Sequence, residues 1–406
     1  MKSIRTFSAL LVISLSSPFH LAYAQSLVQG GGASVPANLY KGSADSILPN
    51  SFSYAVTGSG KGKKAFLSND PSLFGNIGTV HFAASDSVLT ATELSDYTNA
   101  YNVPTTNQKY GALIQIPTAL VPVVIPFNKP GAKLDLSINE ICGVFAGKIT
   151  DWSQLSSGWS SGQSGPITVV YRSESSGSTE VLTRFLSAAC KSVDLFGTSL
   201  KPQSNWSGSA PGFSIQTSFA GLFSNNTAPS NFLPAVATGD TSLLDTVNSG
   251  NGRIGYTGPD VMANPDDATK VARVIGFSPK DVSIPATIGA VSPPTSAQDI
   301  ADPLKWVPNI AYPSTGYPIV GFTNLIIGQC YKRPIVASAI RSFLFNHYGS
   351  AGDSSQDQGP NDATLRAHWF YPLDRTWREA IRTRFALASS STGLNNPGAC
   401  NGIGRP

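Results

Sequence analysis

The sequence predicts an α/β protein of two domains, and three observations carry this prediction. At 406 residues the chain is longer than a single hydrophobic core usually serves. Hydrophobic residues make up 41% and charged residues 13%, as in a folded chain that is rich in turns. A short β-branched or aromatic run, a tip of Gly and Ser, and a helical apolar pattern follow one another repeatedly. Such alternation is typical of an α/β sheet, whose ligands bind at the carboxyl ends of the strands.

The first 24 residues have the features of a secretory signal. A basic start with Lys2 and Arg5 precedes an apolar centre and a small-residue pattern that ends at Ala24, so we expect cleavage before Gln25. No cysteine follows that point directly, which argues against a lipid anchor, and no later apolar run is long enough to span a bilayer. Without Lys2 and Arg5 the formal charge falls from +4 to +2, which is 26 basic minus 24 acidic residues. We expect a soluble protein that is periplasmic or secreted, with no membrane span and no nucleic-acid partner.

Three of the strand, tip and helix units precede residue 100. In the first, a glycine-rich turn ends in Ser34, a suitable helix cap, and Pro36, which suits a first helical position. In the second, lysines follow a Gly-Ser-Gly tip, but they lack the spacing of a nucleotide-binding P-loop. In the third, Thr90 and Glu93 have the spacing of a capping box. The units span residues 30–40, 52–67 and 79–93.

The fourth unit carries the clearest chemical signal. A predicted strand, Ile167–Tyr171, is followed by Arg172 and a Ser-Gly-Ser tip before a helical apolar pattern. The N–H groups of a helix N-terminus, a guanidinium fork and the hydroxyls of Ser176 and Ser178 would then point at one place, as an oxyanion site requires. The same residues also fit a plain N-cap beside a surface arginine, so the oxyanion interpretation needs support from the rest of the chain.

The other elements follow in order. A buried strand within Ala112–Phe127 is expected to cross between the domains, and Ser137 with Glu140 predicts another capping box. Stretches 156–166 and 198–241 are rich in Ser, Gly, Asn and Pro, and we interpret them as surface loops or insertions. Further predictions are a short helix from about residue 243 to 250, strands at 253–256 and 318–327, an irregular stretch at 292–317, and helices at 334–347 and 375–385.

Four cysteines in an exported chain predict two disulfides. Of the three possible pairings, short sequence separation favours Cys142 with Cys190 and Cys330 with Cys400, and free buried thiols are the alternative. The histidines after the signal show no ligand spacing among themselves or with the cysteines, so we expect no metal site. They are His81, His347 and His368.

Taken together, the four tips resemble those of the high-affinity phosphate-binding proteins of bacterial phosphate ABC transporters. The similar segments occur in order along nearly the whole chain after the signal, and they are Gly30–Pro36, Gly58–Gly60, Ala84–Asp86 and Arg172–Ser178. The resemblance is closest to the DING branch of these proteins, through Pro126–Lys129, Cys142–Phe145, Thr150–Ser153 and Val170–Gly177.

The chain departs from this group at two places. The name-giving Asp-Ile-Asn-Gly start is replaced by Leu27–Gly30, and serine stands at Ser34 and Ser178, where relatives often carry threonine. Because serine keeps the hydroxyl, we expect these replacements to change affinity rather than the class of ligand.

The resemblance implies the type II periplasmic binding-protein fold, in which two α/β lobes close like a venus flytrap on a ligand in the cleft between them. Lobe I would comprise residues 25–117 and 318–406, and lobe II would comprise residues 118–317. The implied function is capture of inorganic phosphate for uptake or scavenging, with the permease of a phosphate ABC transporter as partner. We expect a monomer that needs no cofactor.

The resemblance also implies a set of phosphate contacts. From lobe I these are Ser34, Val35 through its backbone N–H, Ser59 and Asp86, and from lobe II they are Arg172, Ser176, Gly177 and Ser178, with Glu174 orienting the guanidinium. An ionised Asp86 can only accept hydrogen bonds, so it would select an ion that still carries a proton, which is hydrogen phosphate rather than sulfate. The alternative role of Asp86 is a cap on the following helix.

Two other functions stay open on the sequence alone. In a DING-type secreted alkaline phosphatase the same cleft would hydrolyse a phosphomonoester, with one of the four serines as nucleophile and Asp86 or Glu174 as base. The sequence shows no cluster of carboxylates and histidines of the kind that binds metals in many phosphoester hydrolases, so we expect a binding protein rather than an enzyme. The other alternative is an extracellular interaction protein that keeps only the fold, and the complete donor set argues against it.

Overall fold

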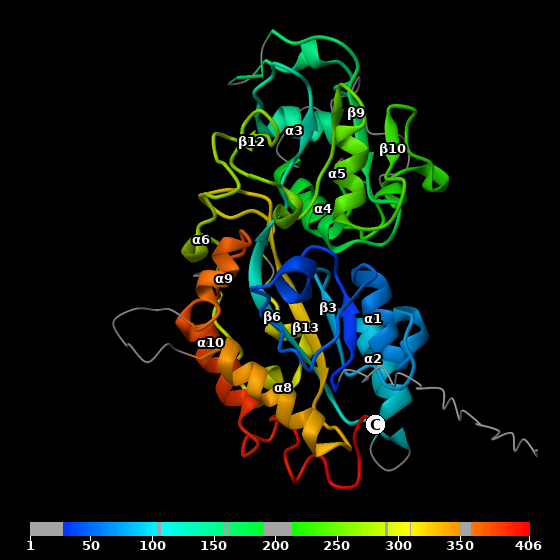
Figure 1. Ribbon diagram of the computed structural model, residues 1–406, viewed down its shortest axis with the longest axis vertical. Coiled ribbons are helices and arrows are strands. Elements are labelled where there is room, and N and C mark those ends of the chain that lie inside the picture. Colours follow the sequence, from blue (N-terminus) through cyan, green and yellow to red (C-terminus); the bar gives the residue numbers. More distant parts are fainter. Residues whose placement is uncertain are drawn as a thin grey trace, which may run out of the picture.

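The structure is a computed structural model in which two α/β lobes lie end to end along the longest axis (Figure 1). It describes residues 27–103, 107–156, 159–160, 162–190, 213–288, 291–308, 310–349 and 359–406. The predicted signal and its cleavage point lie outside these residues. In the described part of the chain no helix is both long and apolar enough to cross a membrane.

Lobe I is built on a mixed five-stranded sheet with helices on both faces (Figure 1). Its strands, in spatial order, are β2 (Ala55–Val56), β1 (Gly30–Gly32), β3 (Phe82–Ser85), β13 (Val320–Gly328) and β6 (Leu113–Pro122). β1 is parallel to both of its neighbours, and β13 is antiparallel to both of its own.

Successive side chains of β13 enter two different cores, as the alternation of a strand requires. Ile326 packs in the core under α1 (Ser59–Ser68) and α2 (Ala91–Tyr101). Leu325 and Ile327 pack in the core on the opposite face, which α8 (Pro334–His347) and α10 (Arg375–Ile381) cover. The Thr90–Glu93 capping box predicted for α2 is formed.

Lobe II is built on a second, four-stranded sheet. Its order is β10 (Phe232–Pro234), β9 (Thr168–Tyr171), β11 (Arg253–Ile254) and β7 (Phe127–Asn128), and only β7 is antiparallel. Its helices are α3 (Ile138–Phe145), α4 (Gly177–Ala189) and α5 (Asp240–Asn248). The Ser137–Glu140 capping box predicted for α3 is formed.

Short elements complete the described chain. They are β4 (Asn102–Val103), β5 (Asn107–Gln108), β8 (Asp135–Leu136), β12 (Arg273–Val274), α6 (Ile284–Ile288), α7 (Ala297–Ala301) and α9 (Asp362–Ala367).

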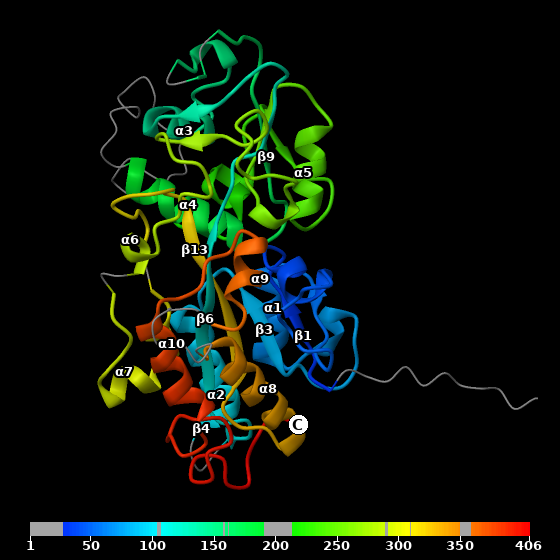
Figure 2. The same cartoon turned by 60° about the vertical axis from the view of Figure 1, so that its left-hand side comes forward.

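Two extended segments cross between the lobes side by side (Figure 2). One continues β6 beyond Pro122 into lobe II, and the other returns through Ile319 into β13. The N–H of Val123 donates to the carbonyl of Ile319 at 2.9 Å, so the segments are hydrogen-bonded where they cross. β6 therefore crosses between the domains, as its sequence predicts.

Ile288 and the segment 291–306 pack on lobe I, although the predicted boundaries place them in lobe II. Ile288, Ile300 and Trp306 belong to the core that α8 and α10 cover. The Trp306 ring lies 4.6 Å from the Phe385 ring, edge to face. The part of the chain that builds lobe II therefore ends before this segment.

The interpretation of residues 198–241 as surface loops or insertions is wrong for its described part. Phe213, Phe219 and Phe232 are buried in the core of lobe II, and the Phe219 ring stacks on Tyr171 at 5.5 Å between centroids. Gly and Ser are frequent in this stretch, but burial of its aromatic side chains beside β9 is favourable enough to hold the segment in the core. Residues 191–212 lie outside the described chain.

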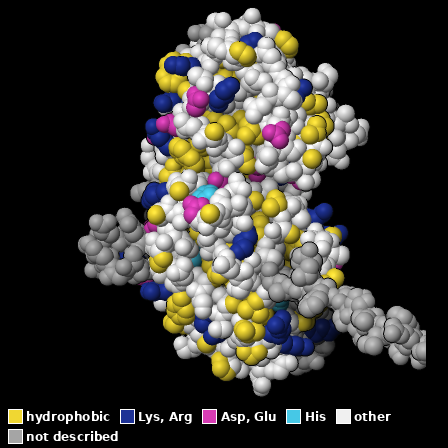
Figure 3. All heavy atoms as spheres, viewed as in Figure 1, with side chains coloured by type: hydrophobic (Ala, Val, Ile, Leu, Met, Phe, Trp, Pro, Cys, Tyr) yellow, Lys and Arg dark blue, Asp and Glu magenta, His cyan; other side chains and the backbone are white. Residues whose placement is uncertain are grey.

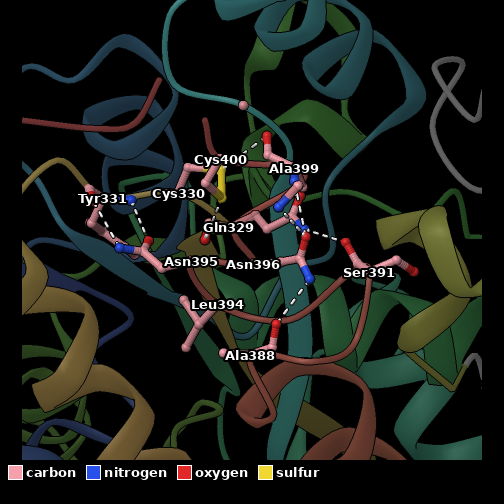
Figure 4. The surroundings of a disulfide bond; sticks show 12 residues. Gln329, Cys330, Tyr331, Ala388, Ser391, Leu394, Asn395, Asn396, Ala399 and Cys400 are labelled. Atoms are coloured by element: carbon pink, nitrogen blue, oxygen red, sulfur yellow. Dashed lines mark hydrogen bonds between the residues drawn. A yellow bond between two sulfur atoms is a disulfide. The ribbon is translucent and has the colours of Figure 1, made fainter. Parts of the chain in front are cut away.

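Two disulfides are formed, as predicted. Cys142 of α3 bonds to Cys190 at the end of α4, and Cys330 bonds to Cys400. The second bond fastens the C-terminal segment beside the end of β13 (Figure 4). In the same place the Asn395 side chain accepts from the N–H of Tyr331 at 2.8 Å and donates to its carbonyl at 3.0 Å.

Candidate functional site

The tips of six strands meet between the two lobes. In lobe I these are the tips that follow β1, β2 and β3, and in lobe II they are the tips that follow β9, β10 and β11. The surface narrows to a waist at this level (Figure 3). The side chains that the tips bring together are buried: the exposed fraction is 7% for Ser34 and between 1% and 3% for Ser59, Asp86, Arg172 and Asp240.

Arg172 lies at the centre of this junction, directly after β9. Its Nε donates to Glu174 Oε1 at 2.7 Å, and Nη2 also contacts that oxygen. Its Nη1 donates to Asp240 Oδ1 at 2.8 Å. Burial opposes the charge of Arg172, but Asp240 and Glu174 outweigh it and raise the pKa of the guanidinium above its ordinary value. The cation is therefore permanent and held in one orientation.

The N-terminus of α4 faces the same place. Ser176 is its N-cap, and the hydroxyls of Ser176 and Ser178 lie 3.2 Å apart. Arg172 Nη1 donates to Ser178 Oγ at 3.2 Å. Because the first N–H groups of a helix have no partner within it, this turn presents donors together with the positive end of the helix dipole.

The opposing helix terminus belongs to α1 of lobe I. Gly58 precedes it with φ +85°, a backbone conformation that glycine adopts without strain, and no side chain caps the helix. Ser59 is its first residue, and its Oγ accepts from the N–H of Asp86 at 3.0 Å. Two helix N-termini from different lobes thus point at one junction.

Asp86 is the one carboxylate that the described part of lobe I places here. Its Oδ1 is buried and has no hydrogen-bond partner among the described residues. Burial, with a smaller contribution from Asp240, raises its pKa to about 7 against the opposing effects of the Thr323 and Ser59 hydroxyls and of Arg172. Near neutral pH this side chain therefore lies close to the balance between its two protonation states.

Ser34 and Val35 follow β1 and reach across to lobe II. Ser34 Oγ donates to Asp240 Oδ2 at 2.7 Å and accepts from Arg172 Nη2 at 3.0 Å. Val35 packs so closely on Gly258 that a Cβ at that glycine would lie 2.7 Å from Val35 Cγ1. The lobes are therefore in direct contact at this tip.

Gly177 makes an equally close contact from α4. A Cβ at this position would lie 2.3 Å from the Cβ of Asp86 and 2.7 Å from Ser59 Oγ. Only a glycine allows lobe II to approach Asp86 as it does here. Each residue that the sequence analysis proposed for the site therefore lies in the junction, and Glu174 contacts the guanidinium as expected.

Sequence reasoning missed Asp240. This residue is the first of α5 and follows Gly239, which has φ +99°. Its Oδ1 also accepts from Thr257 Oγ1 at 2.9 Å and from the N–H of Gly258 at 3.2 Å. The signal was a fifth strand, glycine tip and helix, formed by β10, Gly239 and α5, which the loop-like composition of 198–241 concealed.

A second contact between the lobes lies at the waist. His368, which follows α9 in lobe I, pairs through Nδ1 with Asp260 Oδ1 of lobe II at 2.8 Å and through Nε2 with Asp45 Oδ1 of lobe I at 3.1 Å. The other oxygen of Asp260 accepts from the N–H of Leu39 at 3.1 Å. Burial opposes the charge of His368, but Asp260 and Asp45 outweigh it and raise its pKa.

The junction is suited to an oxyanion that carries a proton. A guanidinium, four serine hydroxyls and two helix N-termini supply donors, and Asp86 supplies a free acceptor. No group of three or more His, Cys, Asp or Glu side chains arranged to hold a metal ion occurs within the described residues.

Comparisons with known proteins give the relatives of the chain. The profile of the PBP superfamily domain matches residues 24–345. Alkaline phosphatase L of Pseudomonas aeruginosa is 42% identical over 405 residues, which is 98% of this chain and all of that protein. The solved phosphate-binding protein from Stenotrophomonas maltophilia is 54% identical, with a TM-score of 0.88 and coverage of 93% of this chain and 99% of that one. A high-affinity periplasmic phosphate-binding protein, PfluDING, solved with bound phosphate, is 39% identical, with a TM-score of 0.79 and the same coverage.

Proposed function

Because this chain belongs to the PBP superfamily, in the group of phosphate-binding proteins that includes the DING proteins, we propose that it captures one inorganic phosphate ion between its lobes. The contacts would be those expected from the sequence: the hydroxyls of Ser34, Ser59, Ser176 and Ser178, the N–H groups of Val35, Gly177 and Ser178, the guanidinium of Arg172 and the carboxylate of Asp86. The protein would be exported after cleavage of residues 1–24 and would act as a monomer that delivers phosphate to a permease.

The observation that carries this proposal is the buried Oδ1 of Asp86, which has no partner among the described residues, beside the guanidinium of Arg172, the serine hydroxyls and two helix N-termini. A buried acceptor without a donor costs about 1–3 kcal/mol, so its retention indicates a role. Hydrogen phosphate can donate its proton to this oxygen while its other oxygens accept from the surrounding groups. Sulfate has no proton at neutral pH and would oppose a carboxylate with a second negative charge.

The test is calorimetric titration of protein that has been unfolded and refolded to remove bound ligand. We expect saturable binding of one phosphate ion and no heat from sulfate. Arg172→Lys keeps a charge but loses the fork that contacts Ser34, Ser178 and the carboxylates, so affinity should fall about 100-fold or more. Arg273→Ala, which removes an arginine of lobe II that stacks on Trp159 away from the cleft, is the matched control and should bind normally. Absence of phosphate heat from correctly refolded protein would end this proposal.

A second candidate function is hydrolysis of phosphomonoesters in the same cleft. The observation that favours it is the hydrogen bond from Ser34 Oγ to Asp240 Oδ2, because a carboxylate that accepts the proton of a serine can act as its general base. Arg172, 3.0 Å from the same hydroxyl, could stabilise the charge on a transferred phosphoryl group. The base here would be Asp240 rather than Asp86 or Glu174.

Hydrolysis of 4-nitrophenyl phosphate by the purified protein tests this candidate. Activity that belongs to the cleft should be lost in Ser34→Ala and should be inhibited by inorganic phosphate. Activity that stays the same in Ser34→Ala and in Arg172→Lys would come from a contaminant, and the binding function would then stand alone.

A further inference from the structure

Asp240 brings to the cleft a carboxylate that is not among the phosphate contacts expected from the sequence. Its carboxylate is buried on every side, and its two oxygens have different surroundings. Oδ1 accepts four hydrogen bonds, all from lobe II, whose donors are Arg172, Ser178, Thr257 and the N–H of Gly258. Oδ2 has one hydrogen-bond partner among the described residues, the hydroxyl of Ser34 in lobe I. The first oxygen is saturated within its own lobe, whereas the second faces the cleft.

The hydroxyl of Ser34 has only one proton, so it cannot donate to both Asp240 and a phosphate oxygen. A serine hydroxyl has one proton to donate, and here it goes to Asp240 while the oxygen accepts from Arg172. A phosphate oxygen that takes this proton leaves Asp240 Oδ2 as a buried acceptor without a donor. When the hydrogen bond from Ser34 to Asp240 stays intact, a phosphate oxygen that contacts the Asp240 carboxylate must carry a proton of its own.

The charges in the junction also favour a ligand that carries an additional proton. The ionisable groups that face Asp240 are Arg172 and Glu174 from lobe II and Asp86 from lobe I. One cation therefore accompanies three carboxylates, of which Asp86 and Asp240 are buried and Glu174 is partly exposed. Hydrogen phosphate adds two further negative charges but only one proton. Asp86 Oδ1 and Glu174 Oε2 have no hydrogen-bond partner among the described residues, and Asp240 Oδ2 has only Ser34. Of the two lobe II carboxylates, Asp240 is the one whose oxygen meets a side chain of lobe I across the cleft.

We propose that Asp240 is a second proton acceptor for the ligand, so that the closed cleft holds phosphate together with one extra proton taken up from solvent. One proton lies between a phosphate oxygen and Asp86, and the other lies between a second phosphate oxygen and Asp240. Each carboxylate then has a donor, and the site holds the dihydrogen form or its equivalent even where hydrogen phosphate is the free ion. The proposal rests on the proposed function and adds the protonation state of its ligand.

Proton uptake is measured by titrating phosphate at pH 8 in two buffers of different ionisation enthalpy. We expect the full-length protein to take up about one proton for each phosphate bound, and its affinity to fall about tenfold for each pH unit above 8. Asp240→Asn, which cannot be protonated, should bind phosphate without net uptake and with a nearly flat pH profile. Asp245→Asn, on the exposed side of α5, is the matched control and should behave as the original protein does.

The outcomes separate this inference from the proposed function. Phosphate binding with no proton uptake by the unaltered protein would overturn the second-acceptor role and leave phosphate capture intact. Uptake that persists in Asp240→Asn but disappears in Asp86→Asn would also overturn it, because Asp86 alone would then carry the proton. Absence of phosphate binding would instead remove the proposed function itself. Where Asp240→Asn does not fold, Asp240→Ser replaces it, and absence of uptake by the unaltered protein overturns the proposal whatever the variants do.

Discussion

The two lobes bring opposite kinds of chemistry to the cleft. Lobe II supplies one cation with its counter-charges already in place, since Arg172 is hydrogen-bonded to both Glu174 and Asp240. Lobe I supplies the short hydroxyls of Ser34 and Ser59 and a single carboxylate, Asp86, whose Oδ1 has no hydrogen-bond partner among the described residues.

The difference is that Arg172 of lobe II is held in place before the ligand binds, whereas Asp86 of lobe I still lacks a hydrogen-bond donor among the described residues. In lobe II the guanidinium of Arg172 is paired with both carboxylates before any ligand arrives, although Glu174 Oε2 has no hydrogen-bond partner among the described residues. Lobe I retains a buried acceptor that destabilises it until a proton-bearing group arrives. We therefore expect lobe I to select a protonated ion through Asp86, and lobe II to hold the ion through the guanidinium of Arg172 and the N-terminus of α4.

The largest effect is expected from a substitution that prevents the two lobes from meeting at Asp86 without altering a charge. Gly177→Ala adds one methyl group, and its Cβ would lie 2.3 Å from the Cβ of Asp86 in the closed form. Overpacking of this kind costs about 1–3 kcal/mol, so we expect phosphate affinity to fall roughly 10- to 100-fold by calorimetry. The melting temperature without phosphate should change little, because an open form has room for the methyl group.

Gly221→Ala is the control for this substitution. Gly221 is also a lobe II glycine with φ outside the left-handed region, and a Cβ there would meet nothing closer than 3.4 Å. It should bind phosphate with unchanged affinity. Normal affinity in Gly177→Ala as well would mean that lobe II can hold phosphate without approaching Asp86.

A smaller effect is expected when lobe I loses its charge. Asp86→Asn should weaken phosphate binding about tenfold, the size of one charge-assisted hydrogen bond, and should admit sulfate. It should also stabilise the empty protein. The pKa of Asp86 is raised by burial to about 7, so the folded state binds the proton more tightly than the unfolded state between about pH 4 and 7.

The sign of this stability effect follows from the direction of the shift. Asp86 costs nothing below pH 4, its cost grows as the pH rises from about 4 to about 7, and it is complete above pH 7, at no more than about 4 kcal/mol. The melting temperature of Asp86→Asn without phosphate should therefore match that of the unaltered protein at pH 4 and exceed it at pH 8. An equal or lower melting temperature at pH 8 would show that Asp86 is not strained.

The sequence predicted much of lobe I and less of lobe II, for physical reasons. The tips at Ser34, Ser59 and Asp86 are close to their strands and helices, so local patterns suffice to find them. Arg172 was found in the same way. Asp240 was not, because β10 has only three residues and lies in a stretch whose composition resembles a loop. Ile288–Trp306 was assigned to the other lobe because its packing partners, such as Phe385, are distant in sequence.

His368 shows the limit of local patterns most clearly. The sequence analysis weighed it only as a metal ligand, because its partners Asp45 and Asp260 lie 323 and 108 residues away. The contact reverses the arrangement of the cleft, since lobe I here supplies the cation and lobe II the anion. It holds the lobes together without touching the proposed ligand.

The smallest expected effect tests this reversed contact. The pKa of His368 is raised by Asp260 and Asp45 against the effect of burial, so its contribution to closure is complete below the ordinary histidine pKa of 6.5 and is lost as the pH rises through the higher, folded value. His368→Gln should therefore bind phosphate about threefold more weakly than the unaltered protein at pH 6 and equally well at pH 9. Asp45→Asn, which leaves the bond between the lobes in place, should have a smaller effect. A deficit in His368→Gln that is the same at both pH values would mean that this contact closes the lobes by packing alone, so that charge attraction between them would be confined to the cleft.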